Sequence, residues 1–221
     1  MGNRITVNVP DSSYLKNVIG YPREGAKAME MQERAGKLHE QVRVINGEEK
    51  LRELVVYISS KCQEDPGFGR VKLNKVLFHS DFRAYRRWRH PITGTPYRRL
   101  PQGPAPRYMV RVLDELHRTD ALRTQIRMVG DKEQKRPIAL RLPNLDYFSG
   151  KEIAMVDEVI SELWGKTATA VSIESHGIQW STRNHLDPMP YESALLSDDP
   201  VTADDVLRAK ELVKGLGIIV S

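Results

Sequence analysis

The chain has little cysteine and no long apolar segment, and each shortage excludes a class of protein. Its 221 residues include one cysteine, Cys62, which excludes an internal disulfide framework and a zinc site built from cysteines. No apolar run approaches the ~20 residues that cross a membrane. The first residues, 1–5, lack the apolar stretch of a secretory signal. We therefore expect a globular protein of the reducing cytoplasm, with no membrane partner.

Acidic residues and lysines are missing from one stretch of the chain, between positions 83 and 111. Its charged residues are all arginines: Arg83, Arg86, Arg87, Arg89, Arg98, Arg99, Arg107 and Arg111. The stretch 167–207 is the reverse, with seven acidic residues against one base, Arg183. The formal net charge of +5 therefore says less than its distribution.

Two interpretations of this basic window stay open. The basic and acidic windows could fold against each other and cancel, or the arginines could face an acidic partner, either nucleic acid or a protein surface. Aromatic residues such as Phe82, Tyr85, Trp88 and Tyr97 lie among the arginines. They are compatible with stacking on bases and equally with anchoring the arginine stems in a core. The absence of lysine favours planar, bidentate recognition.

The periodicity predicts a mainly α protein: a compact multi-helix domain over 46–217 with one small β-hairpin, preceded by an N-terminal extension or arm over 1–45. Helices are expected from a capping-box-like start at Asn46, over 70–88, from Pro106, from a capping box at Ser149, and from Thr167 and Thr202. Alternating residues at 125–128 and 138–142 flank a polar turn and predict the hairpin. The segment 90–103, rich in proline and glycine, is expected to be a stiff loop.

The spacing of polar residues offers no recognisable catalytic or metal site. The six histidines form no metal-binding motif, and no glycine-rich phosphate loop is present. Ser175 and His176 are neighbours in sequence and do not face each other on a helix, so they form no catalytic dyad. We expect His176 to be structural, bonded to a buried carbonyl or to Asp81 beside Trp180. Asp81 ends an apolar helical stretch, so it should be buried with an arginine or a backbone partner.

Four segments in order resemble the Panacea (SocA-like) antitoxin domain family. They are residues 72–81 (KLNKVLFHSD), residues 92–106 (ITGTPYRRLPQGPAP), Ser175-His176 with Trp180, and residues 190–196 (PYESALL). The resemblance spans about residues 46–210. His79 and Ser80 depart from it, standing where an aromatic and a small apolar residue are usual.

The resemblance implies a helical domain that neutralises a cognate toxin protein by direct contact, in a toxin–antitoxin system or on a phage or other mobile element. The missing catalytic and metal-binding motifs predict no enzyme activity and no cofactor, and the alternative to this is an unrecognised hydrolase. The alternatives are a nucleic-acid-binding, autoregulatory protein that uses the window 83–111, and an adaptor that binds a host protein.

Two groups of residues follow as candidates. The residues expected to contact the partner are Arg86, Arg87, Arg89, Tyr97, Arg98 and Arg99, with the last three exposed on the stiff loop. The family-motif residues, expected to be structural, are Leu73, Lys75, Asp81, Thr93, Gly94, Gly103, Pro104, Ser175, His176, Trp180, Pro190 and Tyr191.

Overall fold

The computed structural model describes residues 43–196. The elements in chain order are α3 (Gly47–Lys61), α4 (Arg70–Trp88), β1 (Tyr97–Leu100), β2 (Gly103–Pro106), α5 (Met109–Arg118), β3 (Leu122–Val129), β4 (Lys132–Ala139), α6 (Gly150–Leu163), α7 (Ala168–Glu174), α8 (Ile178–Ser181), β5 (Pro188–Met189) and the 3₁₀ helix η1 (Tyr191–Leu195). This part of the chain is mainly helical, with two small antiparallel sheets. The expected arm (apart from residues 43–45) and the expected helix from Thr202 lie outside the described residues.

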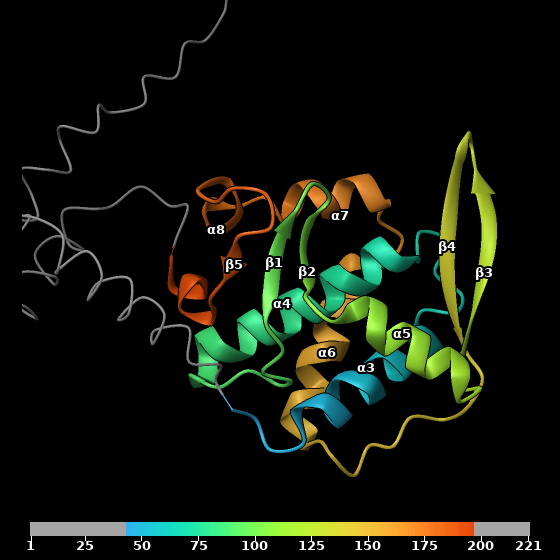
Figure 1. The fold of residues 1–221 in the computed structure, drawn as a ribbon, viewed down its shortest axis with the longest axis horizontal. Helices are drawn as coiled ribbons and strands as arrows, with labels where there is room; N and C mark the ends of the chain where they lie inside the picture. The colour runs from blue at the N-terminus through green and yellow to red at the C-terminus, as the bar shows by residue number, and fades with distance from the viewer. Residues whose placement is uncertain (1–42, 197–221) are drawn as a thin grey trace, which may run out of the picture. The chain divides into compact units, whose positions relative to one another are not determined.

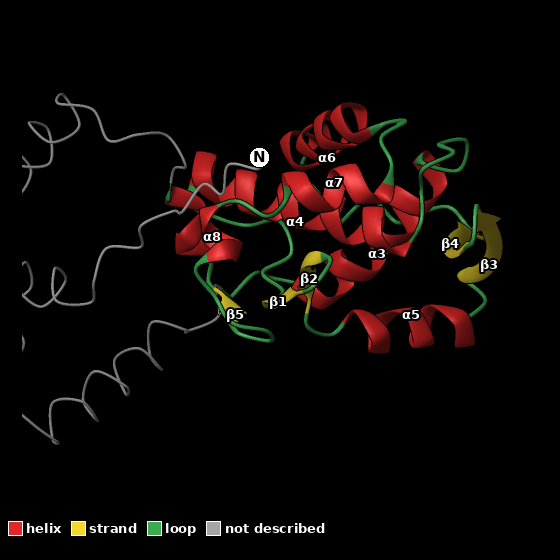
Figure 2. Ribbon diagram, turned by 90° about the horizontal axis from the view of Figure 1, so that it is seen from above, coloured by secondary structure: helices red, strands yellow, loops and turns green. Residues whose placement is uncertain are grey.

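Helix α4 is the central element of the fold. It contacts α3, α6, α7, β2, β4 and η1, and Figure 2 shows α6 on one side of it and β2 and α5 on the other. Its inward residues belong to two hydrophobic clusters. Leu73, Val76 and Leu77 join the main core with α3, α5 and α6, whereas Phe78 and Phe82 join a smaller, largely aromatic cluster. Helix α4 is therefore buried on more than one side, and the prediction of a helix over 70–88 is confirmed.

Helices α3 and α5 each bury one apolar stripe. The stripe residues of α3 and α5 are buried: Leu51, Leu54, Val55, Ile58 and Cys62, and Met109, Val112, Leu113 and Leu116. The capping box of Ser149 and Glu152 opens α6, and the Thr167 side chain accepts a hydrogen bond from the Ala170 N–H at the start of α7. Local capping signals therefore set the starts of α6 and α7.

Two helix starts differ from the prediction. Asn46 makes no side-chain cap, because it adopts a left-handed conformation with φ 56°, and α3 begins at Gly47. A side chain at Gly47 would collide with the Thr93 carbonyl oxygen, 2.4 Å from the position of its Cβ. Pro106 does not open α5, because it pairs with Tyr97 at the end of β2, and the helix begins at Met109.

The prediction of a single hairpin is wrong in number. The expected loop contains β1, which pairs with β2 and with β5 to form a three-stranded sheet in the order β2-β1-β5. The predicted hairpin is present as β3 and β4, and its second strand runs over Lys132–Ala139 where 138–142 was expected. The two-residue turn at Gly130-Asp131 sets this register, because it places Val129 opposite Lys132. Figure 1 shows the turn end of this hairpin extending beyond the helices.

Within residues 43–196, no ion pair joins the basic window to the described part of the acidic window, residues 167–196. Two arginines of the basic window form ion pairs, Arg83 with Glu162 and Arg111 with Glu48, and both carboxylates lie outside the acidic window. Among the described residues no helix is long and apolar enough to span a membrane.

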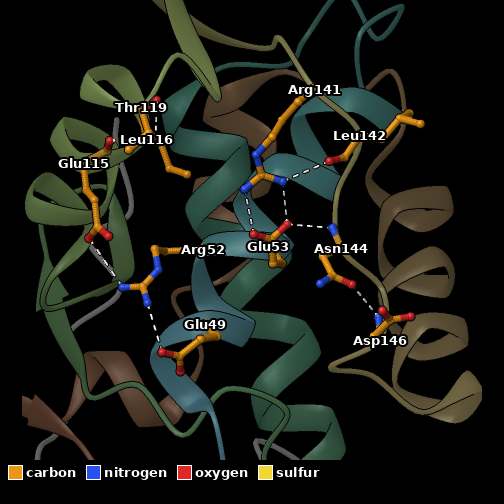
Figure 3. A network of polar contacts seen from close by, with 10 residues as sticks. All are labelled: Glu49, Arg52, Glu53, Glu115, Leu116, Thr119, Arg141, Leu142, Asn144 and Asp146. Carbon is orange, nitrogen blue, oxygen red and sulfur yellow. Dashed lines mark hydrogen bonds and ion pairs between the residues drawn. The ribbon is translucent and has the colours of Figure 1, made fainter.

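The connection between β4 and α6 is fixed to α3 by one carboxylate. Glu53 accepts two hydrogen bonds from the Arg141 guanidinium, at 2.7 and 2.6 Å, and one of 2.7 Å from the Asn144 N–H (Figure 3). Burial raises the pKa of Glu53, but the bonds from Arg141 and Asn144 outweigh it and hold the pKa below its usual value.

Replacing this carboxylate tests the connection. Glu53→Gln should lower the free energy of unfolding at neutral pH by about 1.5–3 kcal/mol, because a charge-assisted bidentate pair is lost. A lowered carboxyl pKa contributes stability above its unfolded value of 4.5 and loses it as the pH falls through the folded value. The difference between wild type and variant in urea unfolding should therefore narrow below pH 4.5. The exposed Glu133→Gln is the control, and a difference independent of pH would contradict the assignment.

Candidate functional site

The carboxylate of Asp81 attaches the motif loop to α4. Asp81 is 1% exposed. One of its oxygens accepts the N–H groups of Ile92 and Thr93, both at 2.8 Å, and the other accepts the Thr93 hydroxyl at 2.6 Å and the Tyr97 hydroxyl at 2.9 Å. The prediction of a buried carboxylate with a backbone partner is confirmed, and hydroxyl groups take the place of the expected arginine. Four donors converging on one carboxylate fix the path of residues 92–97.

Tyr97 is a core residue, and the expectation that it is exposed is wrong. Its side chain is 1% exposed and packs between Phe82 and Tyr191 in the aromatic cluster. Burial and the neighbouring Asp81 raise the pKa of Tyr97 well above its usual value, so the hydroxyl remains a proton donor. Tyr191 donates in the same cluster to the Thr95 carbonyl at 2.7 Å. The alternation of β1 turns Tyr97 inward, and this removes it from the candidate partner-binding residues.

A second attachment joins α4 to β2 through a buried lysine. Lys75 is 1% exposed, and its Nζ donates to the Pro104 carbonyl at 2.9 Å. Burial lowers the pKa of Lys75 to about 7. Gly103 lies close to this lysine and has a φ of 90°. A Cβ added to Gly103 would lie 2.4 Å from the Lys75 Nζ and 2.3 Å from the Ser175 Oγ. Three of the four motif segments therefore meet at one point.

A stack of three side chains forms the third attachment. The Arg99 guanidinium lies 3.8 Å from the centroid of the Trp180 ring, and the His176 ring lies parallel to that ring at 3.7 Å. Trp180 also donates from Nε1 to the Leu100 carbonyl at 2.9 Å. The predicted packing of His176 beside Trp180 is confirmed, but Asp81 is not its partner, since other donors occupy that carboxylate. Burial and the positive charges of Lys75 and Arg99 lower the pKa of His176.

Three arginines remain available at the surface. Arg86, Arg87 and Arg89, at the end of α4, are exposed, and none of them forms an ion pair within residues 43–196. Arg89 ends the helix with a left-handed φ of 60°. Arg98 is only partly exposed on β1. We call Arg86, Arg87 and Arg89 the α4 arginines.

The described residues contain a cavity, but its lining does not resemble an active site. A cavity of about 360 Å³ lies between the start of α3, residues 93–96 and α5. Its charged lining residues include Arg52 and Arg111, which are paired with Glu49 and Glu48. Ser175 does not line this cavity, and its hydroxyl donates to the Ser172 carbonyl at 2.7 Å. No group of three or more metal-ligating side chains was found in the described part of the chain.

One comparison with known proteins, against family models, matches the part of the chain that holds most of these motifs. The model of the family described as "Antitoxin SocA-like, Panacea domain" matches residues 73–181. Residues 73–181 are similar to this SocA-like Panacea domain. No curated protein and no solved structure matches the chain. The Panacea match covers most of α4, the whole β1–β2 pair and the stack on Trp180, which are the parts that the three attachments join.

Most family-motif residues serve the architecture of this Panacea domain. Leu73 and Thr93 are buried, Pro190 immediately precedes η1, and Gly94 has a left-handed φ of 67°. Ser80, one of the departures from the motif, is also buried. The other, His79, is partly buried with its Nε2 unbonded, and burial lowers its pKa to about 3.

Sequence reasoning missed the role of Lys75. A lysine within an otherwise apolar helical stripe is the signal that could have revealed it, because a buried ammonium requires an acceptor. The sequence could not show that the acceptor would be a carbonyl 29 positions away.

Alanine substitutions at two glycines with positive φ allow the cost of steric crowding to be measured apart from the cost of backbone strain. Gly103→Ala should lower the free energy of unfolding by about 2–5 kcal/mol, because backbone strain of about 1–2 kcal/mol adds to overpacking against Lys75 and Ser175. Gly165→Ala is the matched control, with φ 72° and no atom within 4 Å of the added Cβ. It should cost only the backbone term in denaturant unfolding. Equal losses would contradict the close approach at Gly103.

The buried lysine predicts a dependence of stability on alkaline pH. The unfolded chain holds the Lys75 proton up to a pKa of 10.5, whereas the folded protein releases it near pH 7. The unfolded state therefore binds more protons between these values, and stability should rise with pH by on the order of 1 kcal/mol per unit. Denaturant unfolding from pH 7 to pH 9 should show this rise in the wild type and not in Lys75→Met. The half-exposed Lys61→Met is the control variant, and a rise that persisted in Lys75→Met would overturn the assignment.

Proposed function

We propose that this Panacea domain acts as an antitoxin that neutralises a partner toxin protein by direct contact, and that the α4 arginines form part of the contact surface. The family match supports the toxin–antitoxin role. The observation that carries the choice of surface is the exposure of Arg86, Arg87 and Arg89 without ion-pair partners among the described residues. Arginine is a frequent anchor of protein interfaces, since its planar guanidinium binds carboxylates in bidentate fashion.

The scaffold supports a preorganised surface. The α4 arginines follow directly on the buried part of α4, and Asp81 attaches residues 92–97 to the same helix. A contact surface carried by a rigid element loses little conformational entropy on binding. We therefore expect the partner to present an acidic patch, and we place the interaction in the cytoplasm, where Cys62 stays reduced.

The test is co-expression with the protein encoded by the adjacent gene, followed by co-purification and a growth assay. Arg86→Glu/Arg87→Glu should weaken association by roughly thirtyfold or more and abolish growth rescue, because two interface guanidinium groups become carboxylates facing an acidic patch. The free energy of unfolding should stay within about 0.5 kcal/mol of the wild type, since both side chains are exposed. Arg89→Gly is a milder variant that suits the φ of 60°.

The matched control reverses two other exposed arginines, Arg107 and Arg118, and should leave association and rescue intact. Failure of the wild-type chain to associate with the neighbouring gene product or to rescue growth would count against the antitoxin role. Tight binding to DNA or RNA that weakens steeply with salt and is lost in Arg86→Glu/Arg87→Glu would favour a nucleic-acid partner instead. Capture of a host protein at the same surface would favour an adaptor.

A further inference from the structure

The β3–β4 hairpin is an exposed structure on a fixed base. Leu122 and Ala139 pair at that base, Leu122 belonging to the main core. The buried Arg136 donates to the carbonyl groups of Asp65, at 2.9 Å, and Gln63. Beyond Leu122 every residue of β3 is exposed, and the turn end extends past the helices in Figure 1. The fold therefore holds a rigid two-stranded ribbon out in solvent.

The two faces of β3 differ in chemistry. Alternate residues point to opposite faces of a strand, which places Thr124, Ile126 and Met128 on one face and Arg123, Gln125, Arg127 and the exposed Val129 on the other. Ile126 and Met128 are 61% and 60% exposed. Large apolar side chains exposed together on an extended strand are typical of an interaction site.

The outer edge of β3 has no strand beside it within the part of the chain that the structure describes. There the sheet has two strands, so the strand neighbour of β3 is β4. The two-residue turn, with Gly130 at φ 58°, is closed by a hydrogen-bonded pair between Val129 and Lys132. Hydrogen-bonded and non-bonded pairs alternate in an antiparallel ladder. The odd-numbered residues of β3 therefore bond to β4, and the N–H and C=O groups of Thr124, Ile126 and Met128 point outward.

The charges of β3 argue against a second copy of this chain at that edge. In an antiparallel pair between two copies, residues of equal parity face each other, and the register centred on Gln125 places Arg123 of one copy directly opposite Arg127 of the other. Like charges directly opposite are destabilising. Acidic side chains in the partner strand, one opposite each arginine, would form ion pairs with Arg123 and Arg127.

We propose that the outer edge of β3 binds an extended segment of another protein as a third strand, and that this segment alternates apolar and acidic side chains. Its apolar residues would extend the face of Ile126 and Met128, and its carboxylates would pair with Arg123 and Arg127. Main-chain hydrogen bonds would supply affinity, and the alternating side chains would supply specificity. This inference goes beyond the proposed antitoxin contact, because it concerns a different surface and does not depend on the α4 arginines.

The test uses the full chain and a synthetic peptide, acetyl-Thr-Glu-Val-Glu-Val-Glu-Thr-amide, with amide hydrogen exchange measured by NMR. At a peptide concentration about ten times its Kd, exchange at positions 124, 126 and 128 should slow by about tenfold. Positions 123, 125 and 127 should change little, since β4 already protects them. Slowing at the odd positions alone, or at neither set at saturating peptide, would overturn the proposal.

Two controls separate strand addition from attraction of charge. The same peptide methylated on alternate backbone nitrogens keeps its charge but loses donors, and it should not protect the even positions. Arg123→Glu/Arg127→Glu should lose the glutamate peptide and bind its lysine analogue, whereas Arg107→Glu/Arg118→Glu should behave as the wild type. Protection that depends on protein concentration without peptide would indicate a second copy. Binding of duplex DNA in place of the peptide would indicate a nucleic-acid ribbon. Either result would overturn the proposal.

Discussion

The arrangement of the Panacea domain depends on one buried carboxylate. Asp81 gathers two backbone N–H groups and two hydroxyl groups from residues 92–97. A carboxylate removed from water requires such donors, and donors turned toward it require the carboxylate, so neither half of the arrangement is stable alone. The course of β1 and the inward position of Tyr97 follow from this contact. The attachments through Lys75 and Trp180 then hold the rest of the β1–β2 pair.

Local signals predicted the helices because each helix carries its own boundary chemistry and its own apolar stripe. The segment 70–88 and the capping box at Ser149 are examples. The motif segments predicted which residues would be architectural. The structure brings Asp81, Thr93 and Tyr191 together although the last is 110 positions from the first.

The sequence failed where a distant partner decides the structure. Residues 97–100 show no strand pattern, since two arginines stand between Tyr97 and Leu100, and they become a strand only because β2 and β5 pair with them. Pro106 was predicted to begin a helix, but it lies in β2 and pairs with Tyr97 of β1. Distant partners also decide which of the candidate partner-binding arginines stay available at the surface. The α4 arginines lie beyond the buried part of α4, whereas Arg99 is held on Trp180. The outer edge of β3 carries no sequence motif, and it became a candidate binding surface only because the structure shows that its residues are exposed.

The aromatic cluster is completed late along the chain, and this bears on protein synthesis. Phe78, Phe82 and Tyr97 have left the ribosome long before Met189 and Tyr191, which complete the cluster. The Tyr191 hydroxyl also donates to the Thr95 carbonyl. Domains fold as units during translation, at about 5–20 residues per second. A nascent chain that ends before residue 190 therefore has an incomplete aromatic cluster around Asp81. If the ribosome stalled there, residues 92–97 would lack their contact with the Tyr191 ring.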